Sequence, residues 1–196
     1  MLNRVIRAIR TRGVLAAVVL AGLLVGACGS NSPSTSSASS PTPSPKETKI
    51  ASVDACKLVT QSDASAIVGG AAVTNLGASG GAAIPGACIY GSSDSNKPAT
   101  ILVYGQAFAD AASANSASPE QIAAAMNTGF SVSNAKPVSG IGDKAIEYTA
   151  AGGQGNGLVI VVFKANVVFL IYVMPSPDPK ALETLAATAT TRLTAA

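Results

Sequence analysis

A strongly apolar stretch from Leu158 to Met174 limits the folds that this chain can adopt. Eleven of its seventeen residues are Val, Ile, Phe or Tyr, and a polar break falls at Lys164-Ala165-Asn166. Because β-branched and aromatic residues favour strands, the stretch predicts two strands joined by a tight turn. A membrane-spanning helix is the alternative, but Lys164 and Asn166 would lie at its middle. Both strands are apolar at almost every position, which indicates that both faces of the sheet are covered there.

Local capping patterns predict the N-termini of three helices. Thr60 can cap a helix that has Asp63 at its N3 position. Ser118-Pro119 followed by Gln121 forms a second capping box. Asp178-Pro179 begins a C-terminal helix with its apolar residues on one face, Leu182, Leu185, Ala186, Ala189 and Leu193. We expect that face to cover one side of the apolar hairpin.

Shorter apolar runs predict further strands at residues 71–76, 87–90, 100–104 and 145–149. The second and third of these are joined by a polar turn from Ser92 to Pro98. Glycines at positions 153, 155 and 157 superficially resemble a phosphate-binding loop. They lead into a strand and lack a following Lys-Ser/Thr, so residues 152–157 are predicted to be a hairpin loop.

The N-terminus has the organisation of a secretory signal. Four arginines precede an uncharged apolar run, Val14–Val25, which is followed by the small residues Gly26 and Ala27. Twelve residues of helix span about 18 Å, whereas a bilayer core is about 30 Å thick. A transmembrane helix is therefore the weaker interpretation of this segment.

Val25-Gly26-Ala27-Cys28 resembles the bacterial lipobox, in which an aliphatic residue and two small residues precede a cysteine. The resemblance implies cleavage between Ala27 and Cys28 and a diacylglyceryl group on the Cys28 thiol, with acyl chains such as palmitate. Two buried acyl chains anchor a protein stably, whereas one is marginal. We expect a lipoprotein on the extracytoplasmic face of the cell membrane. The alternative is a secreted protein in which Cys28 is fortuitous.

The signal also divides the chain into segments of different composition. We expect residues 1–27 to be the signal peptide, residues 28–49 a Ser/Thr/Pro-rich flexible linker and residues 50–196 a single globular domain. Four of the thirteen basic residues lie before Cys28, whereas all ten acidic residues lie after it, so the mature chain has a net charge of −1. Its basic residues are scattered, which argues against binding to nucleic acid.

Two cysteines remain in the predicted domain, Cys56 and Cys88. In an exported chain, an even number of cysteines favours a disulfide, which would here pin the helix after Thr60 to the sheet. Two free buried thiols are the first alternative. A metal site is the second, but without histidine it would need carboxylates as additional ligands. We expect no metal and no cofactor.

The pattern of these motifs resembles the actinobacterial lipoproteins of the domain of unknown function 3558 family. The motifs are Asp54-Ala55-Cys56-Lys57-Leu58-Val59-Thr60, then Val68-Gly69-Gly70, Cys88-Ile89-Tyr90 and Gly140-Ile141-Gly142-Asp143-Lys144-Ala145, followed by the apolar hairpin. The resemblance implies an α+β fold with an antiparallel β-sheet flanked by helices, similar to the Mog1/PsbP-like α/β/α sandwich. The family has no settled activity, so the resemblance supplies no catalytic residues.

Few residues suggest chemistry. The chain has no histidine, which removes the commonest general base and the usual activator of Ser and Cys nucleophiles. Asp143, Lys144 and Glu147 follow a glycine turn and form a speculative polar site. Asp143 and Glu147 are four residues apart on a predicted strand and would point to the same side. The alternative is a solvated strand start with local ion pairs.

Three functional hypotheses follow. The first is a membrane-anchored, non-catalytic module that binds an unknown protein of the cell envelope. The second is a carrier that holds an apolar small molecule in a cavity between the sheet and the helices. The third is an enzyme, which the missing catalytic residues make the least favoured.

Overall fold

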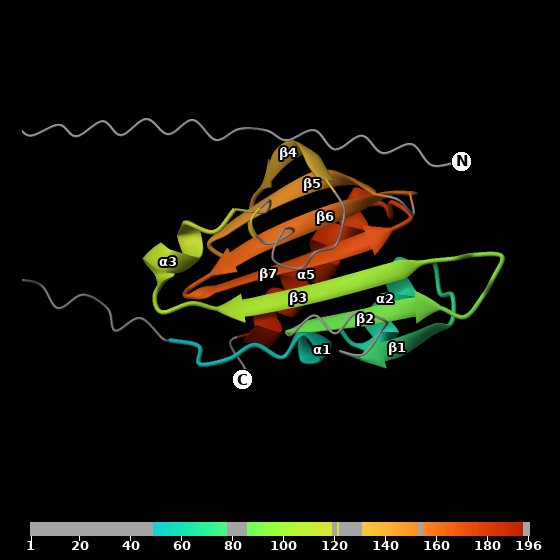
Figure 1. Ribbon diagram of the computed structural model, residues 1–196, viewed down its shortest axis with the longest axis horizontal. Helices are drawn as coiled ribbons and strands as arrows, with labels where there is room; N and C mark the ends of the chain where they lie inside the picture. The colour runs from blue at the N-terminus through green and yellow to red at the C-terminus, as the bar shows by residue number, and fades with distance from the viewer. Residues whose placement is uncertain (1–48, 78–85, 119–120, 122–130, 153–154, 194–196) are drawn as a thin grey trace, which may run out of the picture. The chain divides into compact units, whose positions relative to one another are not determined.

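The computed structural model of the chain describes residues 49–77, 86–118, 121, 131–152 and 155–193 (Figure 1). All of them belong to one compact unit, Ser44–Ala196. The predicted signal peptide, Cys28 and most of the linker lie outside the described residues. So does the helix expected after Ser118, apart from the reciprocal hydrogen bonds between Ser118 and Gln121 that would cap it. Within the described ranges, no helix is long and apolar enough to cross a membrane.

The described strands form a seven-stranded sheet in the order β1-β2-β3-β7-β6-β5-β4, and all its neighbouring strands are antiparallel. The strands are β1 (Val73–Gly77), β2 (Ala87–Ser92), β3 (Thr100–Ala107), β4 (Ser131–Val138), β5 (Lys144–Gly152), β6 (Gly155–Lys164) and β7 (Val167–Met174). The helices described are α1 (Ala55–Leu58), α2 (Gln61–Ile67), α3 (Ala111–Asn115) and α5 (Pro179–Leu193). The expected α+β class, an antiparallel sheet flanked by helices, is confirmed.

The apolar stretch forms the two central strands, as predicted. β6 and β7 are joined by the turn Ala165-Asn166, and Ala165 there adopts a positive φ of 51°. Eleven residues of the pair are at most 2% exposed, namely Val159, Ile160, Val161, Val162, Phe163, Val167, Val168, Phe169, Leu170, Ile171 and Val173. Burial on both faces explains why these strands do not alternate between apolar and polar residues.

Helices α1, α2 and α5 pack on one face of the sheet, and Figure 1 shows α5 crossing behind the central strands. The apolar residues predicted to face the sheet from α5 are all buried: Leu182, Leu185, Ala186, Ala189 and Leu193. On the other face, Ala114 of α3 packs with residues of β5, β6 and β7. The helices therefore lie on both faces of the sheet.

Two parts of the sheet differ from the sequence expectation. The strand β4 was not predicted. The predicted loop at 152–157 is largely strand, because β5 extends to Gly152 and β6 begins at Gly155. Gly157 is needed for close packing, since a Cβ there would lie 2.5 Å from the Val173 carbonyl oxygen.

Candidate functional site

The residues of the predicted polar site have separate partners. Asp143 lies in the turn before β5, and its carboxylate accepts hydrogen bonds from the Ala165 amide at 2.7 Å and Lys164 Nζ at 2.9 Å. These two bonds hold the pKa of Asp143 below its ordinary value. Lys144 begins β5, and its Nζ lies 4.7 Å from the centre of the Phe163 ring. Asp143 therefore stabilises the β6–β7 turn through hydrogen bonds, whereas the Lys144 side chain contacts Phe163 of β6.

Glu147 lies on the other face of the sheet from Lys144, because side chains three residues apart on a strand point in opposite directions. Its Oε1 lies 3.9 Å from Lys136 Nζ, which is also 3.8 Å from Oε1 of Glu183 on α5. Glu147 is 6% exposed, and its buried Oε2 has no hydrogen-bond partner among the described residues. The structure thus does not bring Asp143, Lys144 and Glu147 together, because Asp143 precedes the strand and turns toward β6 and β7.

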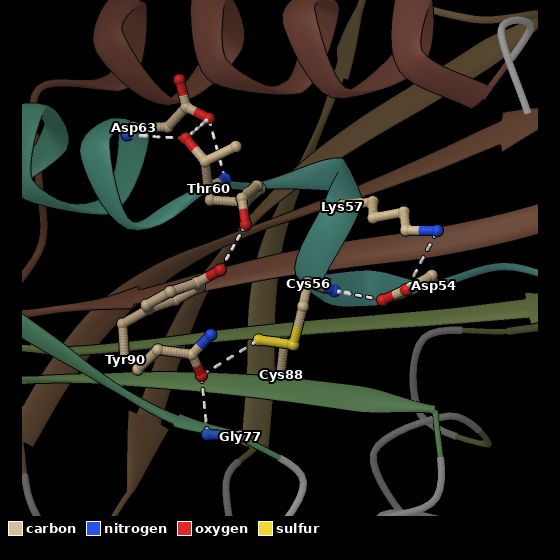
Figure 2. The surroundings of a disulfide bond; sticks show 10 residues. Asp54, Cys56, Lys57, Thr60, Asp63, Gly77, Cys88 and Tyr90 are labelled. Atoms are coloured by element: carbon tan, nitrogen blue, oxygen red, sulfur yellow. Dashed lines mark hydrogen bonds and ion pairs between the residues drawn. A yellow bond between two sulfur atoms is a disulfide. The ribbon is translucent and has the colours of Figure 1, made fainter.

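The predicted disulfide between Cys56 and Cys88 is formed, with the two Cα atoms 5.1 Å apart. Figure 2 shows that it joins α1 to β2, where the sequence had suggested that it would fix the helix after Thr60. Close by, the Tyr90 hydroxyl donates a hydrogen bond to the Val59 carbonyl. Burial raises the pKa of this tyrosine. The short α1 segment is thereby joined to the sheet by one covalent bond and one buried hydrogen bond.

The helix α2 is fixed at its N-terminus by the capping box predicted at Thr60 and Asp63. Asp63 also accepts hydrogen bonds from the guanidinium of Arg192 on α5, at 2.6 Å to Nη1 and 3.3 Å to Nη2. These bonds to Arg192, with those from Thr60, lower the pKa of Asp63 to about 2. Arg192 donates a further bond to the Leu58 carbonyl at 2.6 Å, so it ties α1, α2 and α5 together.

The chain enters the described domain at the β6–β7 turn. The buried Asn166 side chain accepts a hydrogen bond from the Ile50 amide at 2.8 Å and donates one to the Ile50 carbonyl at 2.9 Å. Its Nδ2 also donates to the Phe108 carbonyl at 2.8 Å. The segment that follows the predicted linker is therefore held at this end of the sheet, which lies on the left in Figure 1.

A groove of about 820 Å³ lies at the opposite end of β7. It is bounded by the end of α2, the β2–β3 loop, the start of β6 and the segment that follows β7. The described residues that line it are Ile67, Val68, Gly91, Ser92, Asn96, Lys97, Pro98, Ala99, Thr100, Gly155, Asn156, Met174, Pro175, Ser176 and Pro177. Its size lies within the usual range for ligand-binding sites, about 300–1,000 Å³. We take this groove as the candidate functional site.

The local sequence explains how the groove forms. Pro175 has no amide hydrogen and cannot continue the ladder, so β7 ends at Met174 and the chain leaves the sheet. Thr100 of β3 pairs with Met174, whereas β6 continues past the end of β7 to Gly155. The groove lies where β7 ends and the neighbouring β6 continues.

The wall of the groove is mixed in character and has little charge. Ile67, Val68 and Met174 are half-buried and provide apolar surface, whereas Asn96 and Asn156 are exposed and polar. Lys97 is the charged residue among the described lining residues, and it forms no ion pair within the described part of the chain. The groove can therefore accept a ligand that is neutral or anionic, with some apolar surface.

Sequence reasoning did not identify this groove, because its walls come from four separated segments. The signals that were present are Pro175 and Pro177 after an apolar strand, and the polar turn before Thr100. The space between α5 and the sheet is filled by side chains such as Ile160, Phe169 and Leu182, each fully buried. This part of the layer is therefore filled by side chains.

Comparison with protein-family models finds no match, and no curated protein matches the chain. Among solved structures, the chain is similar to the extracellular domain of PknH from Mycobacterium tuberculosis. The TM-score is 0.50 with 13% sequence identity, over 76% of this chain and 100% of that one. At this identity the likeness extends to the fold alone.

Proposed function

We propose that this protein is a lipid-anchored, non-catalytic binding module on the extracytoplasmic face of the cell membrane, and that the groove at the end of β7 is its binding site. The position of the groove is the observation on which the proposal rests. The chain that leads from Cys28 joins the domain at Ile50, beside Asn166, whereas the groove is at Met174. A tether attached at one end of β7 leaves the other end accessible to a partner in the envelope.

Other features support the same proposal. The lipobox-like residues around Cys28 and the Ser/Thr/Pro-rich segment after it are typical of an anchor and its tether. The resemblance to the domain of unknown function 3558 family agrees with an anchored envelope protein. The comparison structure is itself described as an extracellular domain, which is consistent with this fold serving outside the cell.

Site-directed photocrosslinking in intact cells tests the binding site. A benzophenone amino acid replaces Asn96 at the groove, and in a matched control it replaces Lys57, whose side chain is 83% exposed and outside the groove. We expect a discrete adduct from position 96 and none from position 57. Equal adducts from both positions, or none from position 96, would refute the groove as the site.

Mass spectrometry of the N-terminal peptide tests the anchor independently. The native chain should begin at Cys28 with a diacylglyceryl mass and partition with membranes, whereas Cys28→Ala should have no acyl mass and be released. If the native chain instead begins after Cys28 and has no acyl group, the protein is not anchored through Cys28 and that part of the proposal is wrong.

A further inference from the structure

The geometry points to an extended, acidic peptide segment of a partner protein as the ligand of the groove, added as a strand beside the start of β6. This inference rests on the proposed binding function and specifies the class of ligand. Three features of the groove lead to it: main-chain groups of β6 that face away from β5, a lysine with no ion-pair partner in the described part of the chain, and apolar side chains within reach of alternate ligand residues.

The first feature is the unequal length of β6 and β7. The ladder between them runs from Lys164 with Val167 to Leu158 with Val173. Beyond it, Asn156 and Gly155 continue β6 and pair with β5 alone. In antiparallel strands, successive residues direct their N–H and C=O groups to alternate sides. One of these two residues therefore directs both groups away from β5, toward the groove.

The segment that leaves β7 does not continue the ladder with these groups. It contains Pro175 and Pro177, which have no amide hydrogen to donate to the β6 carbonyls. Both Gly155 and Asn156 are exposed, and a Cβ on Gly155 would lie 3.6 Å from the Met174 sulfur. An incoming extended peptide can occupy the position that β7 has left and satisfy the free groups.

The second feature is the charge of Lys97. The Lys97 amide donates a hydrogen bond to the Asp94 carbonyl at 3.0 Å, which closes a turn. The Asp94 carboxylate accepts a hydrogen bond from the Asn96 amide at 2.9 Å. The Asp94 side chain is thus engaged in the turn, and the Lys97 ammonium has no ion-pair partner among the described residues. With no described acidic residue in the lining, this cation favours Asp or Glu in the ligand.

The third feature is the apolar wall formed by Ile67 and Val68 at the end of α2. Side chains of an added strand alternate between the two faces, so every second one can reach this wall. The β4 edge of the described sheet is less suited to strand addition. Along β4, Lys136, Pro137 and a register shift after Ser133 are features that protect an edge from pairing.

Peptide binding to the mature chain, residues 28–196 with Cys28→Ser, tests the inference. The probes are arrayed random octapeptides, acetylated and amidated so that only side chains are charged. We expect bound peptides to be enriched in Asp and Glu over Lys and Arg. Lys97→Ala should weaken the best peptide about fivefold, and Lys97→Glu should reverse the charge preference. Lys57→Ala is the matched control and should bind like the native chain.

N-methylation of the best peptide tests strand addition. A methyl on an amide that bonds to β6 should weaken binding about tenfold, and a methyl on the next amide should not. The amide resonances of Gly155 and Asn156 should shift on binding. Binding that shows no acid preference, or that is insensitive to every N-methyl group, would overturn the inference and leave the groove as a site.

The remaining outcomes separate this inference from the proposed function. If no octapeptide binds but photocrosslinking from position 96 succeeds, the ligand is not an extended peptide and the binding function stands. If the resonances that shift on binding belong to residues outside the groove and crosslinking from position 96 also fails, both the peptide inference and the proposed binding site are wrong. Thermal unfolding of each variant verifies that the exposed Lys97 can be replaced without loss of the fold.

Discussion

Replacing Asp63 with Asn should destabilise the domain at neutral pH and have little effect in acid. Lowering the pKa of Asp63 from 3.8 to about 2 corresponds to about 2.4 kcal/mol if the full shift is expressed in stability. The side chains of Arg192 and Asp63 remain 31% and 22% exposed, so solvent screening reduces the expected loss to about 1–2 kcal/mol.

The direction with pH follows from the lowered pKa. Because the folded state holds the Asp63 proton less tightly than the unfolded state, this stabilisation is complete above about pH 5 and disappears as the pH falls through about 2. Urea unfolding followed by circular dichroism at pH 6, 4, 3 and 2 measures it. The difference between the native chain and Asp63→Asn should shrink steadily along this series.

An exposed ion pair serves as the control. Lys57 Nζ lies 3.8 Å from Asp54 with side chains 83% and 54% exposed, so Lys57→Met should cost less than about 0.5 kcal/mol. Arg192→Met, the matched change at the partly buried pair, should cost more. A loss for Asp63→Asn that is constant from pH 6 to pH 2 would show that the charge of Asp63 does not stabilise α2, and would refute the reasoning.

Three further predictions concern packing and covalent structure. Replacing Cys56 and Cys88 together with Ser removes a crosslink with a sequence separation of 32 residues and should cost about 2–4 kcal/mol in urea unfolding, and thiol labelling of the folded native domain should find neither cysteine free. Gly142→Ala would place a Cβ 2.6 Å from the Phe163 carbonyl oxygen of β6 and should lower the melting temperature far more than Gly140→Ala. Positive φ is the same obstacle at Gly140, but apart from its chain neighbours no described atom lies within 4 Å of the added Cβ. Leu182→Ala, at a fully buried position on α5, should cost about 2–5 kcal/mol, and an unchanged unfolding midpoint would contradict the packing described.

Sequence reasoning succeeded where local pattern and burial agree. The strands within Leu158–Met174 are buried on both faces, so composition alone predicts them. The α2 start depends on Thr60 and Asp63, three residues apart, and the buried face of α5 follows from helical spacing. In each case the residues that determine the element lie within or beside it.

The missed elements depend on distant partners or weak local signals. Nearly all residues of β4 are exposed, and the strand contains Pro137. Its conformation therefore depends on its pairing with β5, which the composition of residues 131–138 does not reveal. The short helix α3 has a local signal that was overlooked, because Asp110 caps it by accepting a bond from the Ser113 amide at 2.7 Å. The groove could not be predicted, since strand register brings its walls together.

The disulfide also determines how tension would pass through the domain. A pull on the chain before Ile50 would first load the hydrogen bonds to Asn166 and then reach Cys56. From there the covalent bond to Cys88 transmits force directly to β2, the second strand from one edge of the described sheet. The 31 residues between the two cysteines, including α2 and its part of the groove, form a closed loop that the force bypasses. When the tether is stretched, its tension would therefore not pass through the α2 wall of the groove, where a partner is bound.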